Sequence, residues 1–511
     1  VLTLDYQKAS QQFKYSPFVA KQYFADVTST KLNYTHQESL FNDWDRDVLL
    51  KQKFSTQGPA MAVGDVNGDG LDDLYLGGAA GQKKQLFIQQ ANGQFKESAQ
   101  ADFNLDQTTE NTDALFFDAD GDKDLDLFVV TGSNEFEVNA PELHDLLYLN
   151  DGKGNFKRDL RFPTIFENGS CATAADMDHD GDLDLFVGSR MISSKYGFSP
   201  SSNLYINDGT GGFKNYSKRF MPEITELGMV TDAEWADVNK DGYADLVVAQ
   251  DWGGIVVFKN ERGRKLVKQE MVPGSEGLWG CLKPADIDGD GDMDFIAGNF
   301  GLNSKIKASA EFPATLSVND FDKNGTVEQI ISCVTEDGNT YPMVLKGELQ
   351  RATPAIKQKF IKYKDYANKT VEELYSDDQR EGMVLRQITT TESAFLINDG
   401  KGNFSLQALP YEAQFSPIRG IEVSDFDHDG KVDILLAGNF FDSLPEWGRF
   451  DAMYGLMLKG LGKGKFVAQR SKETGFQTRG QVRKMSIAKS KGGNVVILAK
   501  NNDKAQVFQV K

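Results

Sequence analysis

A nine-residue pattern rich in aspartate occurs seven times in this chain, and it constrains the fold more than any other feature. The first copy spans residues 65–73, with oxygen-bearing side chains at positions 1, 3, 5 and 9 and glycine at position 6. The later copies begin at Asp118, Asp176, Asp237, Asp286, Asp320 and Asp425. Short apolar runs flank the copies, for example residues 58–63 and 74–76 around the first. Such runs predict strands, so each copy is predicted to be the loop of a β-hairpin.

A second pattern follows most of these loops. A short apolar run, an Asn-Asp-Gly turn and a further run stand around Asn150, Asn207 and Asn398, and this arrangement is a strong hairpin signal. Loop and turn together give four antiparallel strands in each unit. Most units are about 50 to 60 residues long, a period typical of propeller blades. The sequence therefore predicts an all-β fold, a β-propeller of four-stranded antiparallel blades.

The number of blades depends on the copies that begin at Asp286 and Asp320, which lie closer together than the others. An abbreviated fifth blade would give an eight-bladed ring. If the loop at 320–328 instead joins two strands of one irregular blade, the ring has seven blades. We expect seven, with eight as the alternative.

The two ends of the chain are predicted to meet in one blade. Residues 59–511 form the propeller, and the tail repeats the strand pattern without the acidic loop at 482–488, 495–499 and 505–510. Residues 1–58 are an N-terminal extension in which 23–28 looks like the missing fourth strand. Pairing the two ends would remove exposed sheet edges.

One segment interrupts the repeats. Residues 345–391 contain the helix-start signal Thr353-Pro354 and a capping box that begins at Thr370. We predict a small helical insert within the propeller that packs on the edge of the ring.

The chemistry of the loops suits calcium, a hard cation that takes six to eight oxygen ligands. Side chains at positions 1, 3, 5 and 9 and the carbonyl at position 7 can converge on one ion, and glycine at position 6 permits the positive φ of a sharp turn. Without a cation the clustered carboxylates would repel one another. We expect up to seven Ca²⁺ ions, each with a structural role that ties two strands together.

The predicted ligands, loop by loop, are Asp65, Asn67, Asp69, Leu71 and Asp73; Asp118, Asp120, Asp122, Asp124 and Asp126; Asp176, Asp178, Asp180, Asp182 and Asp184; Asp237, Asn239, Asp241, Tyr243 and Asp245; Asp286, Asp288, Asp290, Asp292 and Asp294; Asp320, Asp322, Asn324, Thr326 and Glu328; and Asp425, Asp427, Asp429, Lys431 and Asp433. The second loop has Lys123 at position 6, so its geometry is open. The sixth has a lower charge, and whether it binds metal is open too.

Composition limits the partners and the compartment. A net charge of −19 and a pI near 4.8 argue against nucleic acid. Three scattered cysteines are too few for a disulfide framework and are expected to be free thiols. No window has the roughly 20 apolar residues of a transmembrane segment. Because the chain begins at Val1, we expect a trimmed product or part of a longer surface protein.

A ligand is expected on the rim opposite the acidic loops, because binding residues concentrate on long connections. Aromatic and arginine side chains gather in those connections, and both serve as anchors at interfaces. The candidates are Arg190, Tyr196, Phe198, Trp252, Trp279, Phe300, Trp447 and Arg449.

Catalysis is not expected, and no catalytic residue is assigned. Only four histidines occur, two of them at non-ligand positions of the acidic loops, and no Ser-His-Asp pattern, phosphate loop or zinc cluster is visible. The alternative is a polysaccharide-active enzyme, a glycoside hydrolase or lyase, for which Glu135 and Glu137 are the first carboxylates to test.

The loop pattern between strands, over roughly residues 23–511, resembles the FG-GAP or VCBS repeat of integrin α-subunit propellers and cartilage acidic protein-like proteins. Residues 298–305 and the helical insert are similar to VCBS-repeat proteins from Bacteroidetes surfaces. The resemblance implies an extracellular or cell-surface protein, outer-membrane-associated or periplasm-facing in a Gram-negative bacterium, that mediates adhesion by binding a protein or glycan. Extracellular calcium modules typically have affinities of about 10⁻⁴–10⁻³ M, which fits that compartment.

Overall fold

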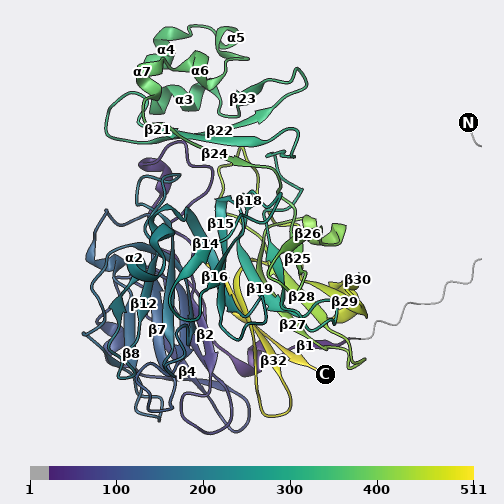
Figure 1. The fold of residues 1–511 in the computed structure, drawn as a ribbon. Coiled ribbons are helices and arrows are strands. Elements are labelled where there is room, and N and C mark those ends of the chain that lie inside the picture. The colour runs from purple at the N-terminus through teal and green to yellow at the C-terminus, as the bar shows by residue number, and fades with distance from the viewer. Residues whose placement is uncertain (1–21) are drawn as a thin grey trace, which may run out of the picture.

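The computed structural model describes residues 22–511, and most of its regular structure is antiparallel β-sheet (Figure 1). The first three ring sheets follow one another in the chain. They are β2 (Met61–Gly64), β3 (Asp73–Leu76), β4 (Gln85–Gln89) and β5 (Phe95–Ser98); β6 (Asn111–Phe117), β7 (Asp126–Thr131), β8 (Leu146–Leu149) and β9 (Lys157–Arg158); and β10 (Asn168–Ala175), β11 (Asp184–Met191), β12 (Asn203–Ile206) and β13 (Lys214–Asn215).

Four more sheets complete the ring. They are β14 (Met229–Ala236), β15 (Asp245–Gly253), β16 (Val256–Asn260) and β17 (Leu266–Lys268), with β18 (Gly277–Leu278) beside β15; β19 (Cys281–Ala285), β20 (Asp294–Gly298), β25 (Ala394–Asn398) and β26 (Phe404–Ala408); β27 (Ile418–Ser424), β28 (Asp433–Gly438), β29 (Leu456–Gly462) and β30 (Lys465–Arg470); and β31 (Gln481–Ala488), β32 (Val495–Asn501), β33 (Gln506–Val510) and β1 (Phe24–Asp26).

These sheets close into a seven-bladed β-propeller, numbered here as blades 1 to 7 in the order given. The inner strands β2, β6, β10, β14, β19, β27 and β31 each contact the next, and β31 contacts β2. The second strand of each blade is buried on both faces between neighbouring blades. In β7, for example, Leu127, Phe128, Val129 and Val130 are fully buried. Burial on both faces explains why these strands are continuous apolar runs.

The seventh blade combines both ends of the described chain. Strand β1 is its outer strand and pairs with β33 in the register Phe24↔Val510, Ala25↔Gln509 and Asp26↔Phe508. Phe24 is buried and lies against Phe426 and Phe476 at ring-centroid distances of 5.4 and 5.5 Å. Of the N-terminal extension predicted over 1–58, residues 1–21 lie outside the described residues.

The connection between β20 and β25 in blade 5 carries an eighth sheet and a group of short helices, here called the insert (residues 299–393). Its strands are β21 (Ala314–Asn319), β22 (Glu328–Val334), β23 (Thr340–Pro342) and β24 (Val384–Ile388), and its helices are α3 (Lys346–Ala352), α4 (Ala355–Lys359), α5 (Tyr363–Tyr366), α6 (Val371–Leu374) and α7 (Asp377–Arg380). The loop at 320–328 joins β21 to β22, outside the ring. The prediction that it joins two strands of an irregular blade is therefore wrong, because these strands pair with β23 and β24 while β19 contacts β27 directly.

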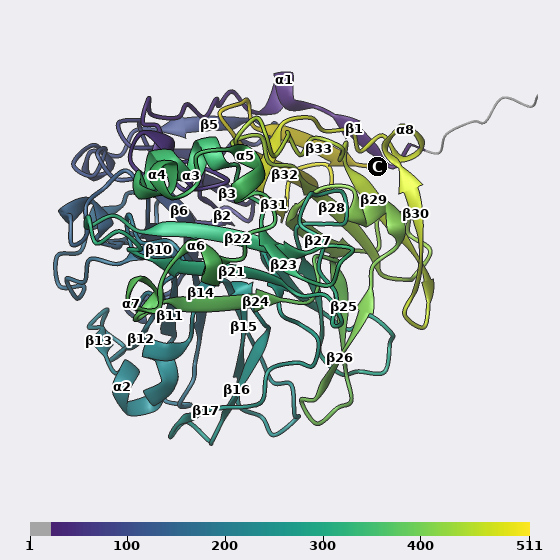
Figure 2. The same ribbon diagram turned by 90° about the horizontal axis from the view of Figure 1, so that it is seen from above.

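The insert lies over one rim of the ring (Figures 1 and 2). Strand β22 alternates between two cores. Ile331 packs toward the ring with Trp252 and Trp447, whereas Ile330 packs toward the helices with Leu349. The prediction that the helices pack on the edge of the ring is wrong, since the sheet β21–β24 separates them from it.

The remaining helical turns belong to connections around the ring. They are α1 (Thr28–Lys31), α2 (Ser217–Phe220) and α8 (Ser471–Thr474), and the 3-10 turns η2 (Asp43–Asp45), η3 (Asp102–Asn104), η4 (Pro141–Leu143), η5 (Pro222–Glu226) and η6 (Tyr411–Gln414). Over residues 22–511, none of the helices combines the length and the apolar character that crossing a bilayer requires.

Candidate calcium loops and the covered rim

All seven acidic loops share one backbone shape, held by their own side chains. In the first loop the carboxylate of Asp65 accepts the N–H of Gly70 at 2.7 Å, and the carboxylate of Asp69 accepts the N–H of Leu71 at 2.9 Å. The same two contacts, from position 6 to position 1 and from position 7 to position 5, occur in the other six loops. The side chains at positions 1 and 5 therefore face the concave side of each turn.

Two residues of every loop have a positive φ, at positions 4 and 6. The sequence predicts only the second of these. Position 6 is glycine except for Lys123, whose φ of 77° and N–H contact to Asp118 reproduce the common shape. Position 4 includes His179 and His428, with φ of 62° and 60°. The open question about the second loop is thus settled, because its backbone matches the others.

The carboxylate at position 9 braces the loop against the rest of its blade. Asp73 is fully buried and accepts the N–H of Val66, at position 2, and the N–H of Gln89, at the end of the third strand, at 3.2 and 2.8 Å. Asp126, Asp184, Asp245, Asp294 and Asp433 accept the equivalent pairs. Burial raises the pKa of Asp73 to about 7. Sequence reasoning identified Asp73 only as a metal ligand and missed the two hydrogen bonds that it accepts from backbone N–H groups.

Several loop carboxylates have an oxygen that is buried and has no hydrogen-bond partner. At position 3 these atoms are the Oδ1 atoms of Asp120, Asp178, Asp322 and Asp427. Burial first, and then a neighbouring carboxylate, raise the pKa of Asp120 and of Asp178. Close carboxylate groups are found at Asp118, Asp120 and Asp122; Asp176, Asp178 and Asp180; Asp286, Asp288 and Asp290; Asp320, Asp322 and Glu328; and Asp425, Asp427 and Asp433. Buried oxygens that lack a proton donor and lie beside like charges fit a hard cation such as Ca²⁺.

The seventh loop differs from the others because a lysine reaches into it. The ammonium group of Lys459 lies against Asp427 and against Oδ2 of Asp429, at 2.9 Å from the latter. These are positions 3 and 5, so the lysine occupies the side of the loop where a cation would bind. The contacts with the two carboxylates hold the pKa of Lys459 above its ordinary value.

In every loop the backbone N–H of position 7 donates to the side chain at position 5. That the carbonyl of position 7 is a calcium ligand stays a prediction. This applies to Leu71, Asp124, Asp182, Tyr243, Asp292, Thr326 and Lys431. Asn67 and Asn239 replace aspartate at position 3 in the first and fourth loops, and each accepts the N–H of position 5 at 2.9 Å.

An asparagine after the third strand links neighbouring loops. Asn150 donates its side-chain N–H groups to the carbonyl of Val66 in blade 1 and of Leu125 in its own loop, at 2.7 and 3.0 Å. Asn207, Asn260 and Asn398 repeat this bridge. Gln89 bridges blade 1 to the carbonyl of Lys489 in blade 7. The sequence marked Asn150, Asn207 and Asn398 as turn residues, but each also donates to a carbonyl of another blade.

The rim opposite the loops is covered by the insert and by the segment 43–58 of the N-terminal extension. Of the predicted ligand-binding residues, Tyr196, Trp252 and Trp447 are buried in the core that joins ring and insert, and Phe198 and Phe300 pack against it. Trp279 is buried between blades 4 and 5. The prediction of an exposed rim is wrong for these residues. The core shared by the ring, the insert and the segment 43–58 encloses the first five, and the strands of blades 4 and 5 enclose Trp279.

The two predicted arginines have different surroundings. Arg190 is buried and donates to Asp251 at 2.7 Å, and the hydroxyl of Tyr196 donates to the same oxygen at 2.8 Å. Arg449 stays exposed, with its guanidinium 3.6 Å from the ring centre of Phe441. Of the eight predicted rim residues, only Arg449 is exposed.

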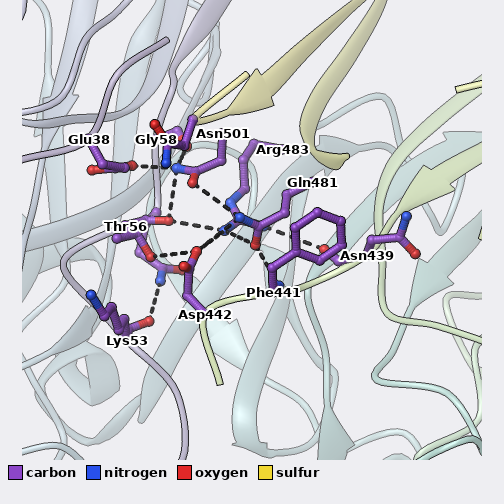
Figure 3. A network of polar contacts seen from close by, with 12 residues as sticks. Glu38, Lys53, Thr56, Gly58, Asn439, Phe441, Asp442, Gln481, Arg483 and Asn501 are labelled. Atoms are coloured by element: carbon purple, nitrogen blue, oxygen red, sulfur yellow. Dashed lines mark hydrogen bonds and ion pairs between the residues drawn. The ribbon is translucent and has the colours of Figure 1, made fainter. Parts of the chain in front are cut away.

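A buried polar network fixes the N-terminal segment across the mouth of the ring (Figure 3). Arg483 donates to the carbonyl of Thr56 and to Gln481 Oε1, both at 3.1 Å. Asn501 donates to the carbonyls of Thr56 and Gly58 and to the carboxylate of Glu38. Blade 7 thereby holds the segment that closes one end of the central channel, and Asp442 of blade 6 accepts the hydroxyl of Thr56 at 3.2 Å.

The channel itself contains a cavity of about 340 Å³ lined by the inner strands. Charged side chains face it, and two of the basic groups are paired there. Lys484 lies 2.6 Å from Asp113, and Lys283 lies 3.1 Å from Glu422.

The carboxylates considered for catalysis do not share one environment. Glu135 is partly buried and accepts the hydroxyl of Ser39 at 2.8 Å, whereas Glu137 is exposed and lies 3.9 Å from Arg46. Both histidines outside the acidic loops are buried or half-buried, His36 with its Nδ1 accepting the N–H of Asn502.

Comparisons with known proteins match the repeats. The FG-GAP-like repeat profile matches residues 65–129 and 237–297. Integrin alpha-4 of Xenopus laevis is 27% identical over 161 residues, which is 27% of this chain and 15% of the length of that protein.

Several solved structures are similar in outline. The V. cholerae biofilm matrix protein Bap1 is 11% identical, with a TM-score of 0.40 over 94% of this chain and 90% of that chain. Saccharomyces cerevisiae Sqt1 is 12% identical, with a TM-score of 0.41 over 94% and 100%. The Dos1 propeller is 10% identical, with a TM-score of 0.38 over 90% and 95%. Identities this low transfer neither a ligand nor an activity.

Proposed function

We propose that this FG-GAP-like repeat protein, a distant relative of integrin alpha, is a calcium-stabilised binding propeller that works outside the cytoplasm. Its role is to bind a protein or a glycan in adhesion, without catalysis. The observation that carries the proposal is the set of buried, unpartnered carboxylate oxygens in loops of one common shape.

Calcium would be held by the side chains at positions 1, 3 and 5, with the carboxylate at position 9 as a further donor. The ion supplies a positive charge that offsets the repulsion between the loop carboxylates and ties the first strand of a blade to the second. The chain's own residues already hold each turn in shape, since positions 1 and 5 accept backbone N–H groups. The sixth loop, with Asn324 at position 5, is expected to bind more weakly.

The compartment follows from the expected affinity. Loops of this kind fill at about 10⁻⁴–10⁻³ M calcium, as in extracellular modules. Cytosolic calcium would leave them empty. We therefore place the protein on the cell surface or in the extracellular space, at the outer membrane or facing the periplasm if the source is a Gram-negative bacterium.

Thermal melting with calcium and with excess chelator tests the calcium part. Each occupied site adds about 2.7 kcal/mol when the free calcium concentration is 100 times its Kd, so calcium is expected to raise the Tm. Magnesium at the same concentration is the matched control, because it demands a tighter octahedral site. Equal melting curves in calcium and in chelator would refute the proposal.

A glycan array and a pull-down from whole cells, each with and without chelator, test the binding part. Ligand capture in calcium that is lost in chelator is the expected result. A protein whose loops are calcium-loaded but which captures neither glycan nor protein would contradict it.

The absence of catalysis is part of the proposal, and the alternative is a glycoside hydrolase or lyase. A panel of polysaccharides incubated with the calcium-loaded protein is expected to yield no new reducing ends and no unsaturated products. Turnover that Glu135→Gln or Glu137→Gln abolishes would replace the proposal with the enzyme.

A further inference from the structure

The first helices of the insert carry a cluster of basic residues on an acidic protein. The sixteen residues 349–364 contain Arg351, Lys357, Lys359, Lys362 and Lys364 and no aspartate or glutamate, in a chain whose net charge is −19. All five side chains are exposed. We call residues 345–364, on α3, α4 and the start of α5, the basic tip.

Most of these charges have no partner within the described residues. Arg351, Lys357, Lys362 and Lys364 form no side-chain hydrogen bond or ion pair there, whereas Lys359 donates to the carbonyls of Glu373 and Leu374. Unpaired cations that lie close together in the chain attract an anionic partner.

Large apolar side chains stand among these charges. Ile361 is 81% exposed, Tyr363 69% and Leu345 60%. The tip has its own core on the other side, where Ile356 and Phe360 are buried. The exposed apolar groups are therefore left over after the local core is filled, and packing within the described chain does not explain them.

The position of the tip suits contact with an extended surface. Helices α4 and α5 lie at the end of the molecule that is farthest from the ring (Figure 1). Apart from the loop at 320–328, the acidic loops lie on the opposite rim, because the insert leaves blade 5 between its second and third strands. The basic tip and the six acidic loops of the ring therefore lie at opposite ends of the molecule.

We propose that the basic tip docks on an anionic lipid membrane surface, with its lysine and arginine side chains at the headgroups and Ile361 and Tyr363 entering the interface. A soluble polyanion would use the charges but gains nothing from an exposed isoleucine. A membrane interface uses both, because apolar area adds to electrostatic attraction there. A second copy of this chain could offer its acidic loops, but calcium in those loops would weaken that attraction.

Flotation of the full chain with vesicles in calcium buffer tests the inference. Binding is expected with phosphatidylcholine mixed with phosphatidylglycerol, but not with phosphatidylcholine alone, and it is expected to fall as salt is raised. Equal binding to both vesicle types, or to neither, would overturn the inference.

Variants separate the two contributions. Replacing Arg351, Lys357, Lys362 and Lys364 by glutamine should weaken binding by about fivefold for each charge removed. The matched control replaces four exposed lysines on outer strands and α8 by glutamine, namely Lys96, Lys214, Lys268 and Lys472. It should retain wild-type binding, and equal loss in both sets would contradict a localised tip.

The apolar contribution has its own variant. Ile361→Ser with Tyr363→Ser keeps every charge and should weaken vesicle binding at least tenfold. If this variant binds vesicles like the wild type while a soluble sulfated polymer competes fully, the site takes a polyanion and the lipid proposal fails. If light scattering shows self-association that the charge variant abolishes, the partner is a second copy. Calcium-dependent melting of each variant checks that the ring is intact, and it reports on the proposed function separately.

Discussion

At the scale of single residues, the side chain that faces a loop decides what the loop can hold. In most loops position 3 offers a free carboxylate oxygen or an amide. In the seventh, Lys459 already supplies a positive charge to Asp427 and Asp429. An ammonium and a calcium ion cannot share these oxygens without strong repulsion, so the seventh loop should be the weakest site on the ring.

Lys459→Met is predicted to add one calcium site to the protein. Removing the ammonium leaves the two carboxylates free for the ion, while methionine keeps a side chain of similar length. Calcium equilibrium dialysis should show about one more ion bound per chain at saturation than in wild type, at a free concentration near 10⁻³ M. Lys463→Met, an exposed position on the same blade, is the control. An unchanged stoichiometry would mean that the lysine does not block the loop.

The buried carboxyl group of Glu38 makes the free energy of unfolding depend on pH. Burial raises the pKa of this carboxyl to about 8 from an ordinary 4.5, although the contact with Asn501 lowers it. Between those values the unfolded chain ionises Glu38 and the folded chain keeps it protonated. The free energy of unfolding should therefore fall as pH rises through this window, and the effect is absent below it.

Glu38→Gln is predicted to remove part of the fall in the free energy of unfolding at high pH. The amide can still accept from Asn501 and cannot ionise, so at about pH 8 the variant should be more stable than wild type by on the order of 2 kcal/mol, and near pH 4 the two should be close. Urea unfolding at both pH values measures the difference. Glu137→Gln, on an exposed side chain, should show no such pattern.

At the scale of elements, the hairpins could be predicted from the sequence. The insert and the segment 43–58, which cover one rim of the ring, could not. Each acidic loop lies between two strands that its own flanking residues specify, and each Asn-Asp-Gly turn specifies the next pair. The loop at 320–328 has the same local pattern as the ring loops. What excludes it from the ring is the direct contact of β19 with β27, and no local pattern encodes that contact.

The prediction of exposed ligand-binding side chains on the opposite rim was wrong for the same reason. Trp252 and Trp447 lie in long connections, which usually face solvent. They are buried because residues far along the chain, such as Leu316 and Leu50, lie on top of them. The loop residues were found because their function needs a fixed spacing within nine residues. The burial of the rim residues depends instead on where the sheet β21–β24 packs against the ring.

Leu316→Ala is predicted to loosen the insert. Leu316 is fully buried on β21 in the core shared with the ring, and truncating it should cost about 2–5 kcal/mol. Hydrogen exchange should show faster exchange in β21 and β22, with the ring strands of blades 1 and 2 unaffected. Val467→Ala, on a side chain that is 44% exposed in β30, is the matched control. Faster exchange throughout the ring would show that insert and ring unfold together.

At the scale of the whole molecule, the ring is held shut where three residues of β1 pair with three residues of β33. Strands β1 and β33 pair in a defined register, and the rest of the ring is built between them. Local repeats and chain closure thus contribute separately to stability. The repeat was evident from the sequence, and so was the closing strand, because residues 23–28 look like the strand that the last blade lacks.

A disulfide across this junction is predicted to stabilise the protein. Ala25→Cys with Gln509→Cys places two thiols at directly paired positions, in a background where Cys171, Cys281 and Cys333 are serine. Closing a loop of this length removes about 6 kcal/mol of unfolded-state entropy in the chain-entropy model. The oxidised form should melt at a higher temperature than the reduced form. Ala25→Cys with Phe508→Cys, one residue out of register, should not form the bond and serves as the control.

The pairing of β1 with β33 also has a consequence for biosynthesis. A ribosome makes Phe24 before the strands of blades 1 to 6 and its partner Val510 after them, so those six blades are complete before the ring can shut. Until then, blade 7 has a bare edge and blades 1 and 7 lack their shared contacts, which leaves the nascent chain open to pairing with other chains. We expect the slowest step of refolding to be this closure, and a chaperone that protects β1 would act while the intervening blades are synthesised.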